Sequence, residues 1–356
     1  MVCPAKTQAA SVTRLAAMLG LAIWSTGPWV VAQTPLGLHL RLEGGKPQLI
    51  VSGEAGNACQ IQWTDKLSAT NRWFHFGHCT LSNSPSLLSD LTSSSTNSRY
   101  YRAVGTPHTN LVWISPGTFT MGSPPDEADR GETEGPQTVV TVSRGFWMGK
   151  FEVTQGDYEA VMGANPSWFN GDRTPEGGPN YGVDPNRPVE QVSWRDATNY
   201  CGRLTERERA AGRVATNSAY RLPTEAEWEY GCRAWTSTRF SHGEDPGYTN
   251  LTYYAWYFDN SNGATHPVGR KLPNSWGLYD LHGNVWEWCQ DWYADAYPGG
   301  IIFDPQGPAT GSGRVVRGGL WDGLAADCRS AYRYFSDPDY GDLYFGFRVV
   351  LDPGEP

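Results

Sequence analysis

The sequence predicts an α+β protein in which a small all-β sandwich precedes a larger, loop-rich domain with few helices. Three observations support this fold class. Short alternating runs dominate the first hundred residues, only three segments carry helix signals, and the chain is rich in Gly (41), Pro (25) and Trp (16). Such a composition is typical of a globular fold with many turns and an aromatic core, and it excludes a long helical bundle.

The first 32 residues have the features of an export signal. Lys6 and Arg14 supply positive charge, and a short apolar run from Leu15 to Trp24 follows. Small residues end this segment at Ala32, where a signal peptidase would cut. An uncleaved anchor is the alternative, although the run is short for a bilayer span. We expect residues 1–32 to be removed, which gives a secreted or periplasmic protein without a membrane span.

Residues 36–104 are predicted to form the small sandwich. Short runs of alternating, β-branched and aromatic residues are separated by Gly, Asn and Ser, which is typical of antiparallel strands. The runs are 38–42, 48–51, 59–63, 73–76 and 100–104. The Ser- and Thr-rich stretch from Ser82 to Ser98 is expected to be a long exposed loop, and residues 105–110 a linker.

Residues 110–352 are predicted to form the second domain, which opens with strands at 112–114 and 119–122. Three helix starts carry a Ser or Thr followed three residues later by an acid, a pair that satisfies free N–H groups at a helix end. The pairs are Thr154 with Asp157, Ser193 with Asp196, and Thr224 with Glu227. The first helix should end at Gly163, and the others should cover 194–210 and 225–233. Turns and short strands are expected after that.

Charge and cysteine content limit the possible partners and cofactors. The net charge is −9, so nucleic acid is not an expected partner. Cys3 lies in the signal segment, and six cysteines remain. An even number in an exported protein favours disulfides. Cys59 and Cys79 are expected to bridge two strands of the sandwich. The sequence contains no C-x-x-C motif, so a zinc ribbon is not expected.

The segment 277–288 holds two carboxylates, two glycines and two tryptophans. Glycine and asparagine suit a tightly wound backbone, and Asp280 and Glu287 supply hard oxygen atoms. Carboxylates and backbone carbonyls are the ligands that Ca²⁺ prefers, so this loop is a candidate calcium site. The alternative is a buried turn sealed by its tryptophans.

Several segments, in order, resemble the sulfatase-modifying-factor domain of formylglycine-generating enzymes. They are WISPGTFTMG at 113–122, EVTQ at 152–155, PVEQVSW at 188–194, RLPTEAEWEY at 221–230, the loop 277–288, RGG at 317–319 and GFR at 346–348. The resemblance implies an irregular fold related to C-type lectins, with structural calcium. The implied calcium ligands are the carboxylates of Asp280 and Glu287 and the carbonyls of Gly283 and Val285. The first domain looks like the β-sandwich that precedes such domains in some exported bacterial proteins.

The catalytic centre of that family does not carry over. Formylglycine-generating enzymes oxidise a substrate cysteine with O₂ and Cu(I), which two cysteines hold shortly after a Gly-Gly-Ser turn. In the matching stretch 318–331, Leu320 stands in place of the serine and Cys328 is the only cysteine. Cu(I) prefers sulfur ligands, and one thiolate does not make a two-sulfur site. We therefore expect no copper and no formylglycine-generating activity. Whether the chain is an enzyme stays open, with Cys328 the one catalytic candidate.

The resemblance also suggests disulfide partners without fixing them. Cys328 would pair with Cys289 or with Cys232. Cys201 would pair with Cys232, or both would be buried free thiols.

A binding module is the alternative function, because a lectin-like scaffold can present a surface without catalysis. The family's groove region contains four candidates, which are Trp321, Arg329, Arg333 and Tyr334. Aromatic side chains there would stack on a glycan or grip a peptide or protein ligand. The arginines would either orient an anionic ligand or pair with nearby carboxylates.

Overall fold

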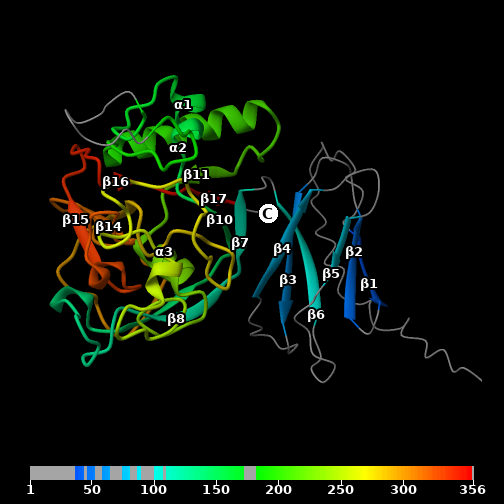
Figure 1. The fold of residues 1–356 in the computed structure, drawn as a ribbon, viewed down its shortest axis with the longest axis horizontal. Helices are drawn as coiled ribbons and strands as arrows, with labels where there is room; N and C mark the ends of the chain where they lie inside the picture. Colours follow the sequence, from blue (N-terminus) through cyan, green and yellow to red (C-terminus); the bar gives the residue numbers. More distant parts are fainter. Residues whose placement is uncertain are drawn as a thin grey trace, which may run out of the picture. The chain divides into compact units, whose positions relative to one another are not determined.

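The computed structural model describes residues 37–43, 46–52, 58–64, 74–80, 86–89, 100–106, 110–171 and 182–354. These ranges contain three α-helices and many short strands (Figure 1). The α+β class is thus confirmed. The predicted export signal, residues 1–32, lies outside the described residues. Among the helices of the described ranges, none combines the length and the apolar character that crossing a lipid bilayer requires.

Residues 37–106 form two antiparallel sheets of three strands each. The first has the order β1 (Gly37–Glu43), β2 (Lys46–Ser52), β5 (Ser86–Ser89); the second has the order β4 (Phe74–Thr80), β3 (Ala58–Thr64), β6 (Tyr100–Thr106). The residues that the structure describes between 37 and 106 all lie in these strands. Strand β5 corrects one expectation, because Ser82–Ser98 is not entirely loop. Leu87 and Leu88 pair with Ile50 and Leu49 of β2.

Cys59 of β3 lies directly opposite Cys79 of β4 in the strand register. Cys59 is disulfide-bonded. The register is the one that a bridge between β3 and β4 requires, but the side chain of Cys79 lies outside the described residues. The pairing of these two cysteines therefore stays a prediction.

Residues 110–354 contain three further sheets. Their strand orders are β11-β17-β10-β7, β15-β14-β12-β16 and β13-β9-β8. The bounds are β7 Leu111–Ile114, β8 Gly117–Met121, β9 Thr138–Val142, β10 Phe146–Gly149, β11 Ala219–Arg221, β12 Trp286–Trp292, β13 Ile301–Phe303, β14 Arg314–Arg317, β15 Arg333–Ser336, β16 Phe345–Gly346 and β17 Val350–Asp352. Short 3₁₀ turns lie at Glu132–Glu134, Leu251–Tyr253 and Ala325–Cys328.

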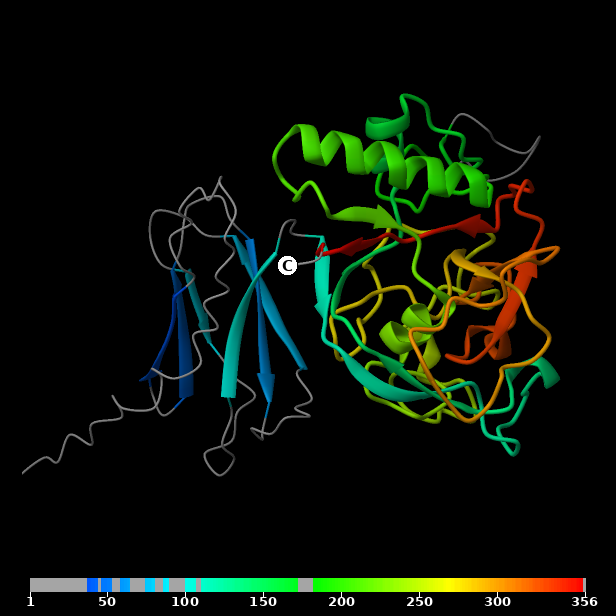
Figure 2. The same cartoon turned by 180° about the vertical axis from the view of Figure 1, so that it is seen from behind.

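The three helices end where the sequence predicts. They are α1 (Gln155–Met162), α2 (Trp194–Ala210) and α3 (Glu225–Arg233). Thr154, Ser193 and Thr224 each accept a hydrogen bond from the third residue of the helix that follows. Figure 2 shows α2 running along β11 and β17, with α3 deeper in the domain. Eight of the nine residues of α3 are buried, so this polar-rich helix is part of the core.

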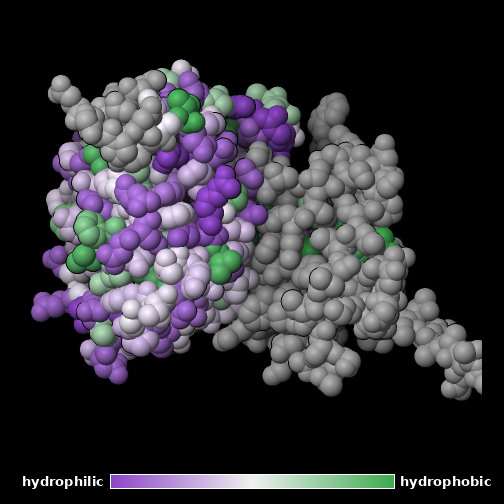
Figure 3. Space-filling model, viewed as in Figure 1, coloured by the Kyte–Doolittle hydropathy of each residue, from purple (hydrophilic) through white to green (hydrophobic). Residues whose placement is uncertain are grey.

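Aromatic side chains fill the core around α3. The Tyr230 ring contacts Phe119, Trp235 and Trp276, with ring centroids 4.8–5.6 Å apart. Trp228 of α3 is fully buried, and its indole nitrogen donates to a carboxylate rather than remaining unpaired. The predicted aromatic core is confirmed. On the face that Figure 3 shows, residues 110–354 present a mostly hydrophilic surface with isolated hydrophobic residues.

Two glutamates of α3, Glu225 and Glu229, lie one turn apart and carry a buried network of ion pairs. Glu229 accepts from Arg233 at 2.8 Å and pairs with Arg317 of β14. Glu225 accepts two hydrogen bonds from Arg333 of β15, at 2.8 and 2.7 Å. The backbone of Gly122, just after β8, also donates to Glu229 at 2.8 Å. These contacts join α3 to two different sheets, and each buried charge has a partner.

Removing one charge of this network should strongly destabilise the domain. We expect Glu229→Gln to lower the free energy of unfolding by about 3–5 kcal/mol, because Arg317 and Arg233 would lose a buried counter-ion. Urea unfolding followed by tryptophan fluorescence measures the loss. Glu206→Gln, an exposed change on α2, should cost less than about 0.5 kcal/mol. A loss below about 1 kcal/mol for Glu229→Gln would show that the network does not hold the fold together.

Candidate functional site

The loop that precedes β12 is wound as tightly as its composition predicts. Asp280 and Asn284 both have left-handed backbone conformations, with φ of 59° and 74°. Gly283 passes so close to the backbone of Trp256 that an added Cβ would lie 2.2 Å from its carbonyl oxygen. Only glycine fits there, and the loop therefore keeps one shape.

Asn284 ties this loop to a buried glutamate that sequence reasoning did not include. Its side-chain nitrogen donates to Glu152 at 2.7 Å, and the backbone N–H of Val285 donates to the other oxygen of Glu152 at 3.2 Å. Glu152 is buried just before α1. Glu152 belongs to the segment 152–155, which resembles the family, and this was the one sequence signal that pointed to it. Nothing in the sequence indicates that it lies beside residues about 130 positions later in the chain.

Asp280 is also buried, and half of its carboxylate is unsatisfied. One oxygen accepts from the backbone of Gly269 at 2.7 Å. The other is buried and has no hydrogen-bond partner among the described residues. Burial is the main cause that raises the pKa of Asp280 to about 6, and the negative charge of Glu287 adds to it. An orphaned buried oxygen of this kind indicates a missing partner.

Glu287, the second predicted calcium ligand, already has a cationic partner. The guanidinium of Arg348 donates to both of its oxygens, at 2.5 and 2.6 Å, and Trp228 donates at 2.8 Å. Of the three carboxylates, Arg348 is bonded only to Glu287, and its charge also acts on Glu152 and Asp280. Lys271 is the second cation that acts on Asp280. Three negative and two positive charges therefore leave one excess negative charge when all groups are ionised. Burial, Asp280 and Glu287 together raise the pKa of Glu152 well above its usual value.

The excess negative charge and the orphaned oxygen of Asp280 fit a hard divalent cation. The described residues hold no group of three or more His, Cys, Asp or Glu side chains placed around one ion. A cation at this loop would therefore depend on Asp280 together with main-chain oxygens such as those of Gly283 and Val285.

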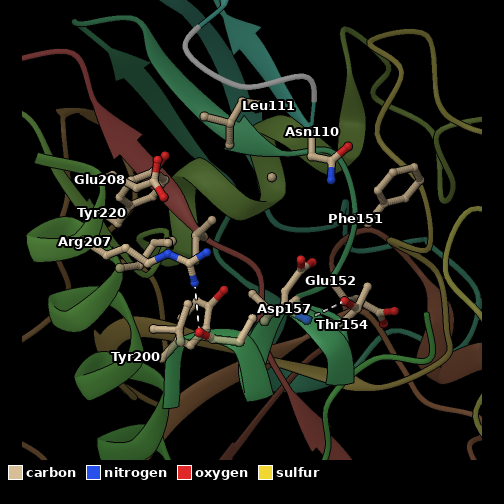
Figure 4. Close-up of a pocket in the computed structure, with 16 residues that line it drawn as sticks. Asn110, Leu111, Phe151, Glu152, Thr154, Asp157, Tyr200, Arg207, Glu208 and Tyr220 are labelled. Atoms are coloured by element: carbon tan, nitrogen blue, oxygen red, sulfur yellow. Dashed lines mark hydrogen bonds between the residues drawn. The ribbon is translucent and has the colours of Figure 1, made fainter. Parts of the chain in front are cut away.

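A cavity of about 160 Å³ borders this cluster on the side of α1 and α2. Figure 4 shows Glu152 next to Thr154 and Asp157, with Arg207, Glu208 and Tyr220 across the cavity. Glu152 is the member of the carboxylate cluster that lines this space.

The four cysteines within the described residues of 110–354 are buried and free. Cys201, Cys232, Cys289 and Cys328 form no disulfides. The predicted bridges of Cys328 to Cys289 or to Cys232 are therefore wrong. Cys328 packs with Phe240 and Leu251, whereas Cys289 belongs to a different core cluster. The thiol of Cys232 lies against the Leu281 carbonyl and His282. The alternative of free thiols at 201 and 232 is confirmed.

Cys328 itself is not placed like a reactive cysteine. It is fully buried, its sulfur lies 3.7 Å from the Leu324 carbonyl, and burial raises the pKa of its thiol. His282 holds its backbone, because one ring nitrogen lies 2.8 Å from the Cys328 carbonyl oxygen. Burial lowers the pKa of His282 to about 3, so this histidine is neutral. It fixes the turn at Cys328 against the loop at 280–288.

Three of the four groove candidates are internal. Trp321 is buried against Phe169 and Tyr344. Arg329 pairs with Glu127 and Glu134, and Arg333 pairs with Glu225. Of the two alternatives for these arginines, the structure therefore shows pairing with nearby carboxylates. Only Tyr334 is exposed, where it stacks on Trp286 at 6.3 Å.

Comparison with known proteins agrees with this geometry. Residues 99–353, more than two thirds of the chain, match the sulfatase-modifying factor enzyme 1-like domain. The formylglycine-generating enzyme of Mus musculus is 29% identical over 83% of this chain and 92% of its own length. Two solved structures have a TM-score of 0.57. Variable protein 1 of Treponema denticola is 34% identical, with 67% of this chain and 94% of that one covered. PvdO from Pseudomonas aeruginosa is 32% identical, with 68% and 94% covered. The chain therefore belongs to the sulfatase-modifying factor family.

Proposed function

We propose that this chain is an exported member of the sulfatase-modifying factor family that does not convert cysteine to formylglycine. One observation carries the proposal: the stretch after Gly318 and Gly319 contains a single thiol, Cys328, and that thiol is buried with a raised pKa. A two-sulfur copper centre needs two neighbouring thiolates that reach the metal and the substrate.

The residues present do not fit Cu(I). Residues 318–327, where the family would place a second copper-binding cysteine, contain no cysteine. Among the described cysteines, Cys232 faces His282 and the Leu281 carbonyl, and burial raises the pKa of its thiol to about 12. A neutral buried thiol is a poor ligand for a metal that binds thiolate. No step of the family's oxidation is therefore assigned to this chain.

Export is proposed from the N-terminal segment, whose positive residues precede a short apolar run. The alternative of a glycan- or peptide-binding groove is not favoured. Three of its main candidates, Trp321, Arg329 and Arg333, are buried and have partners within the domain. Tyr334 and the neighbouring Phe335 are exposed, but they stack on Trp286 and Tyr293 of the domain itself and do not make a binding groove.

We also propose a structural Ca²⁺ at the loop 280–287. Asp280 would bind through its unpartnered oxygen, together with the carbonyls of Gly283 and Val285. Glu287 would act mainly through its charge, because Arg348 already occupies its oxygens. A bound cation would offset the excess negative charge of this buried cluster.

If the copper centre has been lost, the protein should not oxidise a cysteine-containing peptide. With Cu(I) and a cysteine-containing peptide, we expect oxygen uptake no higher than in the protein-free control, and no Cu(I) retained against a chelator. Cys328→Ser should behave like the parent chain in both assays. Stoichiometric Cu(I) that is retained by the parent and lost in Cys328→Ser would contradict the proposal.

The calcium proposal predicts a metal-dependent melting temperature. At a calcium concentration about a hundred times the Kd, binding should stabilise the chelator-treated protein by about 2.7 kcal/mol and raise Tm by several degrees. Asp280→Ala should abolish most of this increment, whereas Asp126→Ala, an exposed change, should leave it intact. Equal Tm values with calcium and with chelator would refute the site, without affecting the conclusion on copper.

A further inference from the structure

A second and larger cavity lies between the β13-β9-β8 sheet and the segment that follows β12. Its volume is about 490 Å³. Most of its wall is apolar and is formed by Met121, Trp292, Tyr297, Pro298, Ile302 and Phe303. Neither the carboxylate cluster at Asp280 nor the thiol at Cys328 lines this cavity. A cavity of this size, mainly apolar with few polar groups, has the character of a small-molecule site.

Two carboxylates line this cavity, Glu225 and Asp291, and Glu225 is held by Arg333. Asp291 is only 4% exposed. One of its oxygens accepts the backbone N–H of Glu225, at the start of α3, at 2.8 Å. Among the residues that the structure describes, no cation forms an ion pair with Asp291, although Arg333 lies near enough to lower its pKa. The carboxylate therefore keeps free capacity to accept a hydrogen bond.

The backbone beside Asp291 is built to leave room for its carboxylate. Gly307 has a φ of 70°, and a Cβ there would lie 2.9 Å from the Cβ of Asp291 and 3.1 Å from the oxygen that Glu225 does not bind. A larger residue would both be strained and press on this oxygen. The close packing of Gly307 on Asp291 explains why glycine occupies position 307.

The other charged groups at the cavity are already satisfied. The Nε and Nη2 of Arg333 donate to Glu225, and its Nη1 donates to the carbonyls of Thr133 and Ala294. The ring of Tyr297 lies 4.4 Å from the Arg333 guanidinium, and its hydroxyl donates to Glu225 at 3.0 Å. Neither Arg333 nor Glu225 has to leave its partner for a ligand, so Asp291 is the group that is open to one.

We propose that this cavity binds a small organic ammonium ion, with the amino group paired to Asp291 and the apolar body against Trp292, Tyr297 and Ile302. The residues that line the cavity determine the kind of ligand that it would bind. A carboxylate without a cation disfavours anions and attracts a positive charge, and hydrogen bonds to an ionised group are the stronger ones. The rings of Trp292 and Tyr297 already lie against the guanidinium groups of Arg314 and Arg333, at 3.6 and 4.4 Å, so they supply apolar contact to the ligand rather than a free cation–π face. The proposal is independent of the copper and calcium assignments.

The protonation of Asp291 gives the proposal a distinctive pH dependence. Burial and the negative charge of Glu225 raise the pKa of Asp291 to about 8. The charged or titratable groups that face it are Glu225 and Glu227 of α3, Cys289 of β12, Arg314 of β14 and Arg333 of β15. Burial raises the pKa of Cys289 well above its usual value, and the arginines stay charged. From pH 6 to 8, Asp291 is therefore the acid expected to lose its proton on binding a cation.

Calorimetry with the full chain tests the proposal, using 2-phenylethylamine and its neutral analogue 2-phenylethanol as probes. At pH 8 the amine should bind at least about tenfold more tightly than the alcohol. Its affinity should rise by nearly tenfold per pH unit from pH 6 and level off above pH 8, because a cation binds the ionised form of Asp291. Equal affinity of amine and alcohol, or amine affinity independent of pH, would overturn the proposal.

Two variants separate the site from the rest of the surface. Asp291→Asn should remove the preference for the amine and its pH dependence, whereas Asp295→Asn, an exposed aspartate four positions on, should leave both unchanged. Ala296 is exposed and lines the cavity, so Ala296→Trp should fill the entrance and weaken amine binding at least about tenfold without changing the core. Amine binding that survives both Asp291→Asn and Ala296→Trp would place the ligand elsewhere and refute the site.

Discussion

The pairing of α3 carboxylates with arginines from β14 and β15 is the interaction on which the domain depends. A charged group in a dry interior is tolerated only with a partner, and Glu225 and Glu229 lie between Arg317, Arg333 and Arg233. The network fixes helix and sheet at one distance and one angle. It also positions Asp291, which accepts the first N–H of α3. The same pairing logic recurs at Glu287 with Arg348. The buried Glu152 accepts from Asn284 and the Val285 N–H and forms no ion pair among the described residues. Asp280 and Asp291 likewise have no cation within ion-pair distance in that part of the chain.

The surroundings of Asp280 and Asp291 differ, and we propose that each carboxylate binds a different kind of cation. Asp280 lies in a polar loop whose carbonyls can join it around a hard cation. Asp291 lies in an apolar wall that suits an organic cation. The thiol at Cys328, by contrast, is held in a hydrophobic cluster and against His282, in a purely structural setting. The chain keeps the scaffold of the sulfatase-modifying factor family. Our proposal that it lacks the sulfur chemistry of the formylglycine-generating enzymes agrees with the rule that function resides in particular side chains rather than in the fold.

Local signals in the sequence predicted local structure well. The caps at Thr154, Ser193 and Thr224 gave the three helices with their observed ends, because capping is decided within four residues. The strand at Ser86–Ser89 was missed, since two leucines within a Ser-rich stretch form a strand only when β2 is available to pair with them. Glu152 and Asp291 were missed for the same reason, because their roles depend on partners far away in the chain. The disulfides at Cys328 failed because sequence spacing does not show which core cluster a cysteine enters.

The burial of α3 has a consequence for how this domain forms. Nine residues are too few for a helix to persist in water without tertiary contacts, and its acidic groups lie opposite arginines more than 80 residues later in the chain. The central helix and the late strands must therefore consolidate together, after most of the domain has been synthesised. A nascent chain that ends before Arg317 would leave Glu225 without either of its arginine partners and Glu229 with Arg233 alone, so the full network can form only after β14 and β15 have been synthesised.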